Sequence, residues 1–170
     1  MRVQDPSSRA LRSRIIQEKV FSSDDFRDSS VIMMYVSMPA EVDTYEIIKK
    51  SLEEGKRVVV PYVDTTNQTM VASELLSIND LVEGPFGIKQ PKDGPARSVQ
   101  LEEIDLIVVP GIAFDKKNMR LGRGKGYYDH FLAAKELSSA KTIGLAFRFQ
   151  VLESIPVLPH DKPVSRVISD

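Results

Sequence analysis

The chain has 170 residues, a net charge of −1 and no cysteine, which excludes disulfides, thiolate zinc sites and a cysteine nucleophile. Hydrophobic residues make up 42% and charged residues 28%, proportions that predict one soluble globular domain over residues 1–170. The near-neutral charge and the lack of an apolar run of about 20 residues argue against nucleic-acid and membrane partners. With no apolar signal core at the amino terminus, a cytoplasmic protein is expected, a monomer with a dimer as the alternative.

The amino-terminal stretch predicts a helix over residues 6–20. Asp5 can cap its first turn, and Pro6 suits its first position. One apolar stripe of this helix is formed by Leu11, Ile15 and Ile16. Arg9 and Arg12 are three residues apart and share a face. The residues alone favour a solvated basic face there.

Two strands and a helix are expected next. Continuous apolar runs at 31–36 and 57–62 predict strands that are buried on both faces. The helix between them is capped by Asp43 or Thr44 and ends at Gly55.

The second half of the chain continues the alternation. Residues 70–75 alternate in polarity and predict an edge or antiparallel strand, whereas 83–98, rich in proline and glycine, predict a long loop. The strongest strand signal lies at 104–110, followed by a buried strand at 142–147 and a weaker terminal strand at 164–169.

This alternation of strands and helices predicts an α/β fold. We expect a Rossmann-like, three-layer protein with a mainly parallel central sheet, mixed at its edge and flanked by helices. In such sheets ligands bind at the carboxyl ends of the strands. Three feature-rich loops fall at that edge, namely 37–43, 110–126 and 148–161.

The stretch RLGRGKGYYD at 120–129 is the strongest candidate site. Alternating glycines can turn successive backbone N–H groups toward an anion, while Arg123 adds a planar fork and Lys125 a mobile charge. The spacing fits neither a Walker A motif nor a dinucleotide fingerprint. A helix expected from about 125 to 136 adds the positive end of its dipole. The stretch therefore predicts a phosphate-binding loop, with a flexible basic loop as the alternative.

The residues that follow the glycines suggest further ligands. On a helix Tyr127 and Tyr128 point about 100° apart, so one packs inward and the other faces the loop, where its ring suits a flat ligand. Two core tyrosines are the alternative. Asp129 can hold Mg²⁺ that bridges phosphates, or form an ordinary ion pair with Lys125.

Acidic residues occur in the other two loops. Glu41 or Asp43 can accept hydrogen bonds from a ring amine of a ligand, although Asp43 also suits a helix cap. Asp161 lies in PHDKP (159–163), as a site residue or a turn residue.

Together these motifs resemble the 5-formyltetrahydrofolate cyclo-ligases, also called 5,10-methenyltetrahydrofolate synthetases. The resemblance covers nearly the whole chain, in family order and spacing. It rests on VPGIAFDKKNMRLGRGKGYYDHFL (109–132), EVDT (41–44), KRVVVP (56–61), GLAFRFQ (144–150) and PHDKPV…VIS (159–169). It implies Mg-ATP-dependent conversion of 5-formyltetrahydrofolate to 5,10-methenyltetrahydrofolate, through phosphorylation of the formyl oxygen and ring closure. A non-catalytic folate- or nucleotide-binding relative is the alternative.

The resemblance also implies a role for individual residues. Arg123 and Lys125 would stabilise the transferring phosphate, and Tyr127 would lie against the folate near the formyl group. The ATP-binding residues would be Ser8, Arg9, Arg12, Arg120, Leu121, Gly122, Arg123, Gly124, Lys125, Gly126, Tyr127 and Tyr128. The folate would contact Met38, Asp43 and Tyr127, together with the candidate Glu41. Asp129 and Asp161 would hold Mg²⁺, directly or through water.

Three positions depart from the family pattern. Ser8 stands where the family usually has lysine, so one phosphate contact is expected to be lost or supplied by another cation. Gln90 precedes Pro91 where the family has Glu-Pro, and Ser165 stands where aspartate is common.

Overall fold

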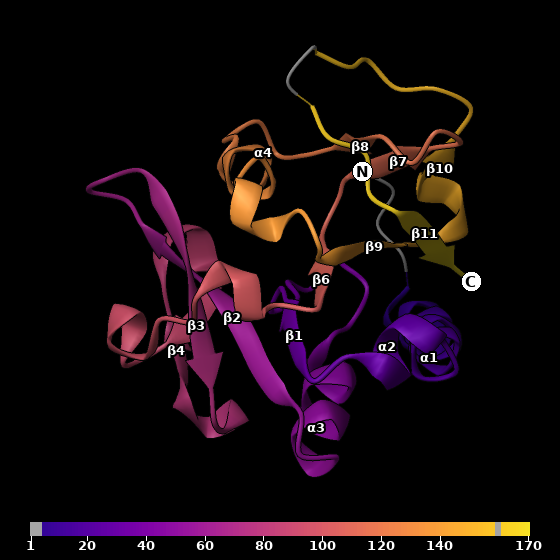
Figure 1. Cartoon of the computed structure of the whole chain (residues 1–170). Helices are drawn as coiled ribbons and strands as arrows, with labels where there is room; N and C mark the ends of the chain where they lie inside the picture. Colours follow the sequence, from indigo (N-terminus) through magenta and orange to yellow (C-terminus); the bar gives the residue numbers. More distant parts are fainter. Residues whose placement is uncertain (1–4, 159–160) are drawn as a thin grey trace.

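The computed structural model describes residues 5–158 and 161–170, and Figure 1 gives the arrangement of the elements. A six-stranded sheet forms the centre, in the order β11-β9-β6-β1-β2-β3. Its strands are β1 (Val31–Met34), β2 (Arg57–Asp64), β3 (Thr69–Leu75), β6 (Leu106–Val109), β9 (Lys141–Ala146) and β11 (Arg166–Ser169). All neighbours pair in parallel except β2 and β3, which are antiparallel. The expected α/β fold with a mixed edge is confirmed.

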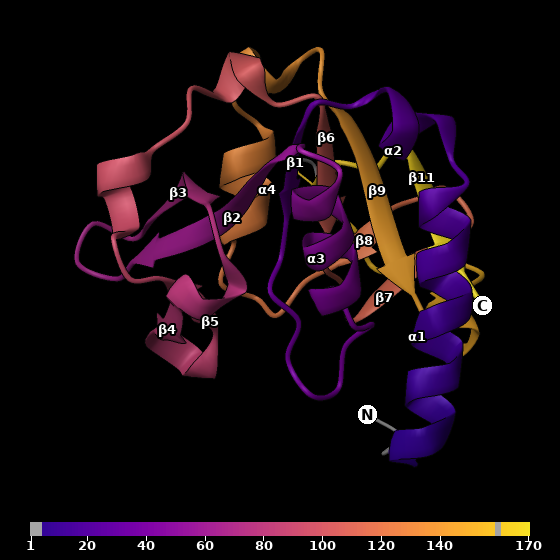
Figure 2. The ribbon, with the colours of Figure 1, turned by 90° about the horizontal axis from the view of Figure 1, so that it is seen from below.

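Helices cover both faces of this sheet. They are α1 (Pro6–Phe21), α2 (Asp24–Asp28), α3 (Tyr45–Glu53) and α4 (Tyr127–Leu132). Figure 2 shows α1, α2 and α3 on one face and α4 on the other. The side chains of β1 alternate accordingly, because Ile32 packs with the cluster under α1 and α3, whereas Met33 packs with the cluster that contains Phe131 of α4. Both clusters are buried, so the continuous apolar runs do mark strands covered on two sides.

The buried face of α1 differs from the predicted stripe. Leu11 is 63% exposed and Ile15 37% exposed, and only Ile16 of the three is buried. The buried residues are instead Ser13, Ile16, Gln17 and Val20, which share one helical face. The two polar members of this face are satisfied by hydrogen bonds to the backbone of Asp43. Gln17 Nε2 donates to its carbonyl at 2.8 Å, and Ser13 Oγ accepts from its N–H at 3.1 Å. Apolar periodicity could not predict this face, because α1 contacts the loop that contains Asp43 through polar side chains.

Two small sheets lie where loops were expected. Within 110–126, the strands β7 (Ala113–Asp115) and β8 (Arg120–Leu121) join β10 (Val151–Leu152) in a three-stranded sheet. Within 81–91, β4 (Leu81–Glu83) and β5 (Lys89–Pro91) form an antiparallel hairpin. The single long loop predicted for 83–98 is therefore wrong in part. These strands have two or three residues each, too few to produce a readable alternation.

Gln90 holds the hairpin β4–β5 against the central sheet. Its side chain is buried, and Oε1 accepts a hydrogen bond from the N–H of Val63 in β2 at 3.2 Å. This contact gives a structural reason for a side chain with an acceptor oxygen at this position.

Candidate functional site

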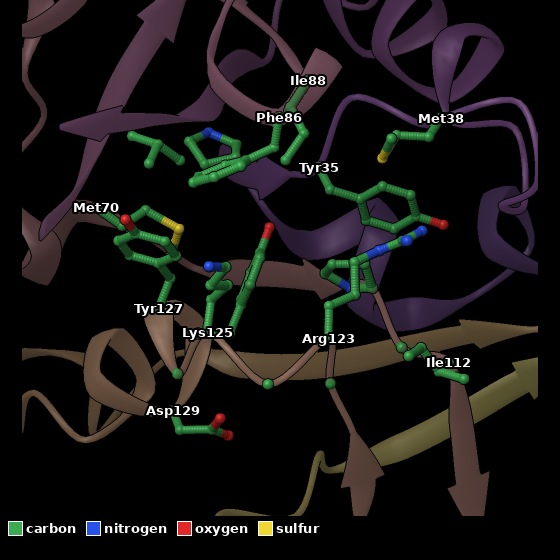
Figure 3. Close-up of a pocket in the computed structure, with 18 of the residues that line it drawn as sticks. Tyr35, Met38, Met70, Phe86, Ile88, Ile112, Arg123, Lys125, Tyr127 and Asp129 are labelled. Carbon is green, nitrogen blue, oxygen red and sulfur yellow. The ribbon is translucent and has the colours of Figure 1, made fainter. Parts of the chain in front are cut away.

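A cavity of about 250 Å³ opens at the carboxyl edge of the central sheet (Figure 3). The loop after β1 and the loop after β6 form two of its walls, as predicted for parallel strands. The basic loop before α4 forms a third wall, and β2, β3 and the β4–β5 hairpin close the last side. The predicted residues that line it are Met38, Glu41, Arg120, Gly122, Arg123, Gly124, Lys125, Gly126, Tyr127, Tyr128 and Asp129.

The glycines give the basic loop a backbone that other residues would not adopt. Gly124 has φ +81° and Gly126 φ +72°, both left-handed. Because Gly126 turns the chain this way, α4 begins at Tyr127 and not near Lys125. The helix has six residues and ends at Leu132, so it is shorter than the helix predicted over about 125 to 136, and its dipole at the loop is correspondingly smaller.

Arg120 and Asp129 form a buried ion pair behind the loop. Arg120 Nη2 lies 2.5 Å from Asp129 Oδ1, and the side chains are 5% and 22% exposed. Glycine at 122 makes room for this arginine, since a Cβ there would lie 2.6 Å from Arg120 Nη1. The charge predicted to bind phosphate is therefore already neutralised inside the protein. The partner of Asp129 is Arg120, not the Lys125 of the simple helix-pair alternative.

The two tyrosines divide as expected. Tyr128 packs against the core cluster that contains Phe131, and burial raises the pKa of its hydroxyl, with a further contribution from the charge of Glu41. Its hydroxyl and Arg120 Nε have no hydrogen-bond partner within the described part of the chain. Tyr127 lines the cavity and lies beside Met70 in Figure 3. A neutral phenol and an apolar rim thus border the site.

The remaining two cations of the loop meet different partners. Arg123 Nη2 lies 2.9 Å from Glu41 Oε1, across the cavity. The ammonium of Lys125 lies 5.4 Å from the centre of the Phe86 ring. Phe86 is an exposed residue of the β4–β5 hairpin with φ +61°. Phe86 is not among the predicted site residues, although a lone aromatic between glycines in GPFG (84–87) is a usable signal.

The cavity is otherwise lined by apolar side chains that the sequence analysis did not assign. Tyr35, at the end of β1, donates its hydroxyl to the carbonyl of Val42 at 3.1 Å, and burial raises its pKa. The others include Val63, Met70, Ile88 and Ile112. Such walls suit a flat, largely apolar ring.

Asp43 does not line the cavity. Its Oδ1 accepts a hydrogen bond from the N–H of Tyr45 at 2.9 Å, at the start of α3. The next residue, Thr44, is the N-cap and donates its hydroxyl to the carbonyl of Tyr35 at 2.7 Å. The helix-start alternative therefore describes what Asp43 does in this structure.

The amino-terminal candidates also lie outside the cavity lining. The N–H of Ser8 donates to Asp5 Oδ2 at 3.0 Å, which confirms Asp5 as the cap of α1. Arg12 lies 3.8 Å from Asp170 and 5.9 Å from the centre of the Phe149 ring, while Arg9 is partly buried. Arg12 thus faces the end of β11.

The carboxylates Asp129 and Asp161 do not form a preformed metal site. They suit a metal ion that binds together with a phosphate ligand. Residues 5–158 and 161–170 contain no group of three His, Asp or Glu side chains that could hold one. Asp161 Oδ2 accepts from the N–H of Leu158 at 2.7 Å, and Asp161 is not in the cavity lining. The neighbouring His160 lies outside the described residues. Mg²⁺ commonly binds through one carboxylate, water and substrate phosphates, and Asp129 at the cavity edge fits that pattern.

The fold and the site together define a class of protein. They describe an α/β protein whose cavity, at the carboxyl edge of the sheet, places cationic side chains next to apolar walls. The sequence matches the 5-formyltetrahydrofolate cyclo-ligase family over residues 2–170. This chain belongs to that family, and 5-formyltetrahydrofolate cyclo-ligase activity is its function.

Similar proteins cover most of the chain. The 5-formyltetrahydrofolate cyclo-ligase of Mus musculus is 34% identical, over 99% of this chain and 87% of the mouse protein. That of Escherichia coli K12 is 29% identical, over 81% and 76%. The NMR structure of Aquifex aeolicus 5,10-methenyltetrahydrofolate synthetase is similar with a TM-score of 0.80 and 32% identity, over 97% of this chain and 81% of that one. A synthetase from Mycoplasma pneumoniae has the same fold, with a TM-score of 0.76 at 20% identity, over 99% of this chain and 90% of that one.

Proposed function

We propose that this chain uses Mg-ATP to close the ring of 5-formyltetrahydrofolate, releasing ADP and phosphate. Residues 1–170 would act as one cyclo-ligase domain, a cytoplasmic monomer that binds only small molecules. The observation that carries the proposal is the cavity in which Arg123 and Lys125 face apolar walls. This combination suits a phosphoryl group next to a pteridine.

The reaction has two steps. The formyl oxygen attacks the γ-phosphorus, an O–P bond forms, and the bond from phosphorus to the oxygen of ADP breaks. The second folate nitrogen then adds to the formyl carbon and loses its proton, and the carbon–oxygen bond breaks to release phosphate. Phosphorylation turns the formamide oxygen into a leaving group, so the chemistry requires no nucleophile from the protein.

The protein's contribution is charge and position. Arg123 and Lys125 would stabilise the oxygens of the transferring phosphate, and Tyr127 would orient the folate against the apolar walls. Arg9 and Arg12 would extend the nucleotide site along α1, with Ser8 adding no charge. Mg²⁺, when bound, would neutralise phosphate charge, with Asp129 and, through water, Asp161 as its protein contacts.

A spectroscopic assay tests the proposal. The protein is mixed with 5-formyltetrahydrofolate and Mg-ATP, and the absorbance of the methenyl product is followed together with ADP release. We expect one ADP for each methenyl product. Folded protein that gives neither would refute the proposal, and folate binding without ADP release would indicate a non-catalytic relative.

A further inference from the structure

One ion pair crosses the cavity and joins its two chemically different sides. Glu41 comes from the loop after β1, and Arg123 comes from the basic loop 82 positions later. Their side chains meet at 2.9 Å, and they are 15% and 50% exposed. Each member of the pair is a candidate contact for a different substrate.

The carboxylate is the fixed member of this pair. Glu41 Oε2 accepts a hydrogen bond from the N–H of Met38 at 2.9 Å, while the N–H of Glu41 donates to the carbonyl of Met38 at 3.0 Å. The turn therefore holds Glu41 from both ends. Arg123 reaches it with a long, half-exposed side chain, so a competing anion would move the arginine and leave the carboxylate in place.

The other two cations of the loop are in different states. Arg120 is paired with Asp129, and these side chains are only 5% and 22% exposed. Lys125 faces the ring of Phe86, and no ion pair is recorded for it within the described part of the chain. Arg123 is thus the loop arginine whose ion pair has a half-exposed guanidinium, whereas the guanidinium of Arg120 is buried.

We infer that Glu41 is a positioning residue that couples the binding of the two substrates. The inference rests on the proposed function. A carboxylate accepts hydrogen bonds from ring N–H and amino groups, and a guanidinium binds phosphate oxygens. The pteridine therefore binds to Glu41 through hydrogen bonds, and the nucleotide binds to Arg123 through its phosphate oxygens. Whichever substrate binds first breaks the ion pair and releases the other partner for the second substrate.

Binding of one substrate should strengthen binding of the other, by a factor that follows from the ion pair. Both substrates gain affinity from each other, by the same factor, because linkage is reciprocal. A partly exposed pair of this kind corresponds to a factor of about two to five in an equilibrium constant. Binding of the folate should strengthen nucleotide binding by about that factor.

Titration calorimetry of the full chain with a Mg-bound, non-hydrolysable ATP analogue tests this inference. Wild type is titrated with and without saturating 5-formyltetrahydrofolate, and Glu41→Gln is titrated in the same way. Glutamine keeps an acceptor for the N–H of Met38 but removes the charge. We expect Glu41→Gln alone to bind the analogue about two- to fivefold more tightly than wild type, with no further gain from folate.

Glu103→Gln is the matched control. Glu103 forms an ion pair with Arg57 at 2.6 Å, and neither residue lines the cavity. The substitution therefore removes one negative charge, as Glu41→Gln does, without changing the site. The variant should bind the analogue and show the coupling as wild type does. The inference is overturned if folate leaves the wild-type affinity unchanged, or if Glu41→Gln binds the analogue no more tightly. The turnover assay distinguishes failure of the proposed function from failure of this inference. If wild type forms product but shows no coupling, only the coupling is refuted.

Discussion

Asp129→Asn is the change that best tests how the basic loop is built. Asparagine has the same shape, but it removes the charge that faces Arg120 at 2.5 Å. The guanidinium stays buried, with only 5% of its side chain exposed and its Nε already without a partner in the described residues. The substitution therefore leaves an uncompensated charge behind the basic loop.

The expected cost follows from this burial. Breaking a fully buried pair by removing one partner costs about 3–5 kcal/mol. Asp129 is 22% exposed and asparagine retains one acceptor, so we expect a smaller loss, about 2–3 kcal/mol in the free energy of unfolding. For a chain of this size that loss lowers Tm by about 5–10 °C.

Two measurements on the Asp129→Asn variant test the two roles of Asp129, as the ion-pair partner of Arg120 and as a ligand of Mg²⁺. Thermal unfolding reports the free energy, and the Mg²⁺ concentration at half-maximal turnover reports the metal. If Asp129 anchors Arg120, Tm falls, and if it also contacts Mg²⁺ as proposed, the Mg²⁺ requirement of the remaining activity rises. A lower Tm with an unchanged Mg²⁺ requirement would leave Asp129 as an anchor only. An unchanged Tm would refute the reasoning, and a raised Mg²⁺ requirement with it would assign Asp129 to the metal instead. Glu103→Gln, in an exposed pair with Arg57, should leave Tm unchanged.

Three further predictions concern other parts of the molecule. Lys125→Ala should lower kcat by about 100-fold or more, as loss of one transition-state contact does, with Tm nearly unchanged because Lys125 is exposed; near-normal turnover would remove it from the mechanism. Gln90→Ala leaves the N–H of Val63 without its acceptor and should cost about 1–2 kcal/mol in urea unfolding, a loss that Gln90→Glu partly restores; equal stability of the alanine variant would contradict the structural role. The pKa values of Tyr35 and Tyr128 are raised by burial, so their contribution to stability is complete below pH 10 and is lost as the pH rises above it. Absorbance at 295 nm should show these two tyrosines ionising only on alkaline unfolding, and titration of all five tyrosines near pH 10 in the folded protein would contradict this.

The sequence predicts the sheet well because each central strand carries its own evidence. The run 104–110 is apolar on both faces, and such a run has few alternatives to a buried strand. Once the strands were placed as parallel neighbours, the meeting of the loops after β1 and β6 followed from topology alone. The small strands β7 and β8 were missed because two or three residues carry no period. β8 pairs with β7, and β7 pairs with β10, where Val151 lies opposite Phe114, 37 positions earlier. A local pattern cannot contain that contact.

The site was predicted at the level of residue type, and its pairings were not. Arg120, Arg123 and Lys125 look alike in RLGRGKG, and charge counting treats them as three equal phosphate ligands. In the structure Arg120 pairs with Asp129, Arg123 pairs with Glu41, and Lys125 lies over the ring of Phe86. Asp129 lies in the same stretch as the cations, but Glu41 and Phe86 come from distant segments, so no local window contains the information that separates the three cations.

This division also changes what the glycines of the loop are for. Gly122 is needed by Arg120, since a side chain there would collide with the guanidinium. Gly124 and Gly126 are needed for left-handed backbone, which ends the loop and lets α4 begin. The spacing that resembles an anion nest is thus partly explained by an internal ion pair. The charge left for a phosphate is that of Lys125 and, once Glu41 releases it, Arg123.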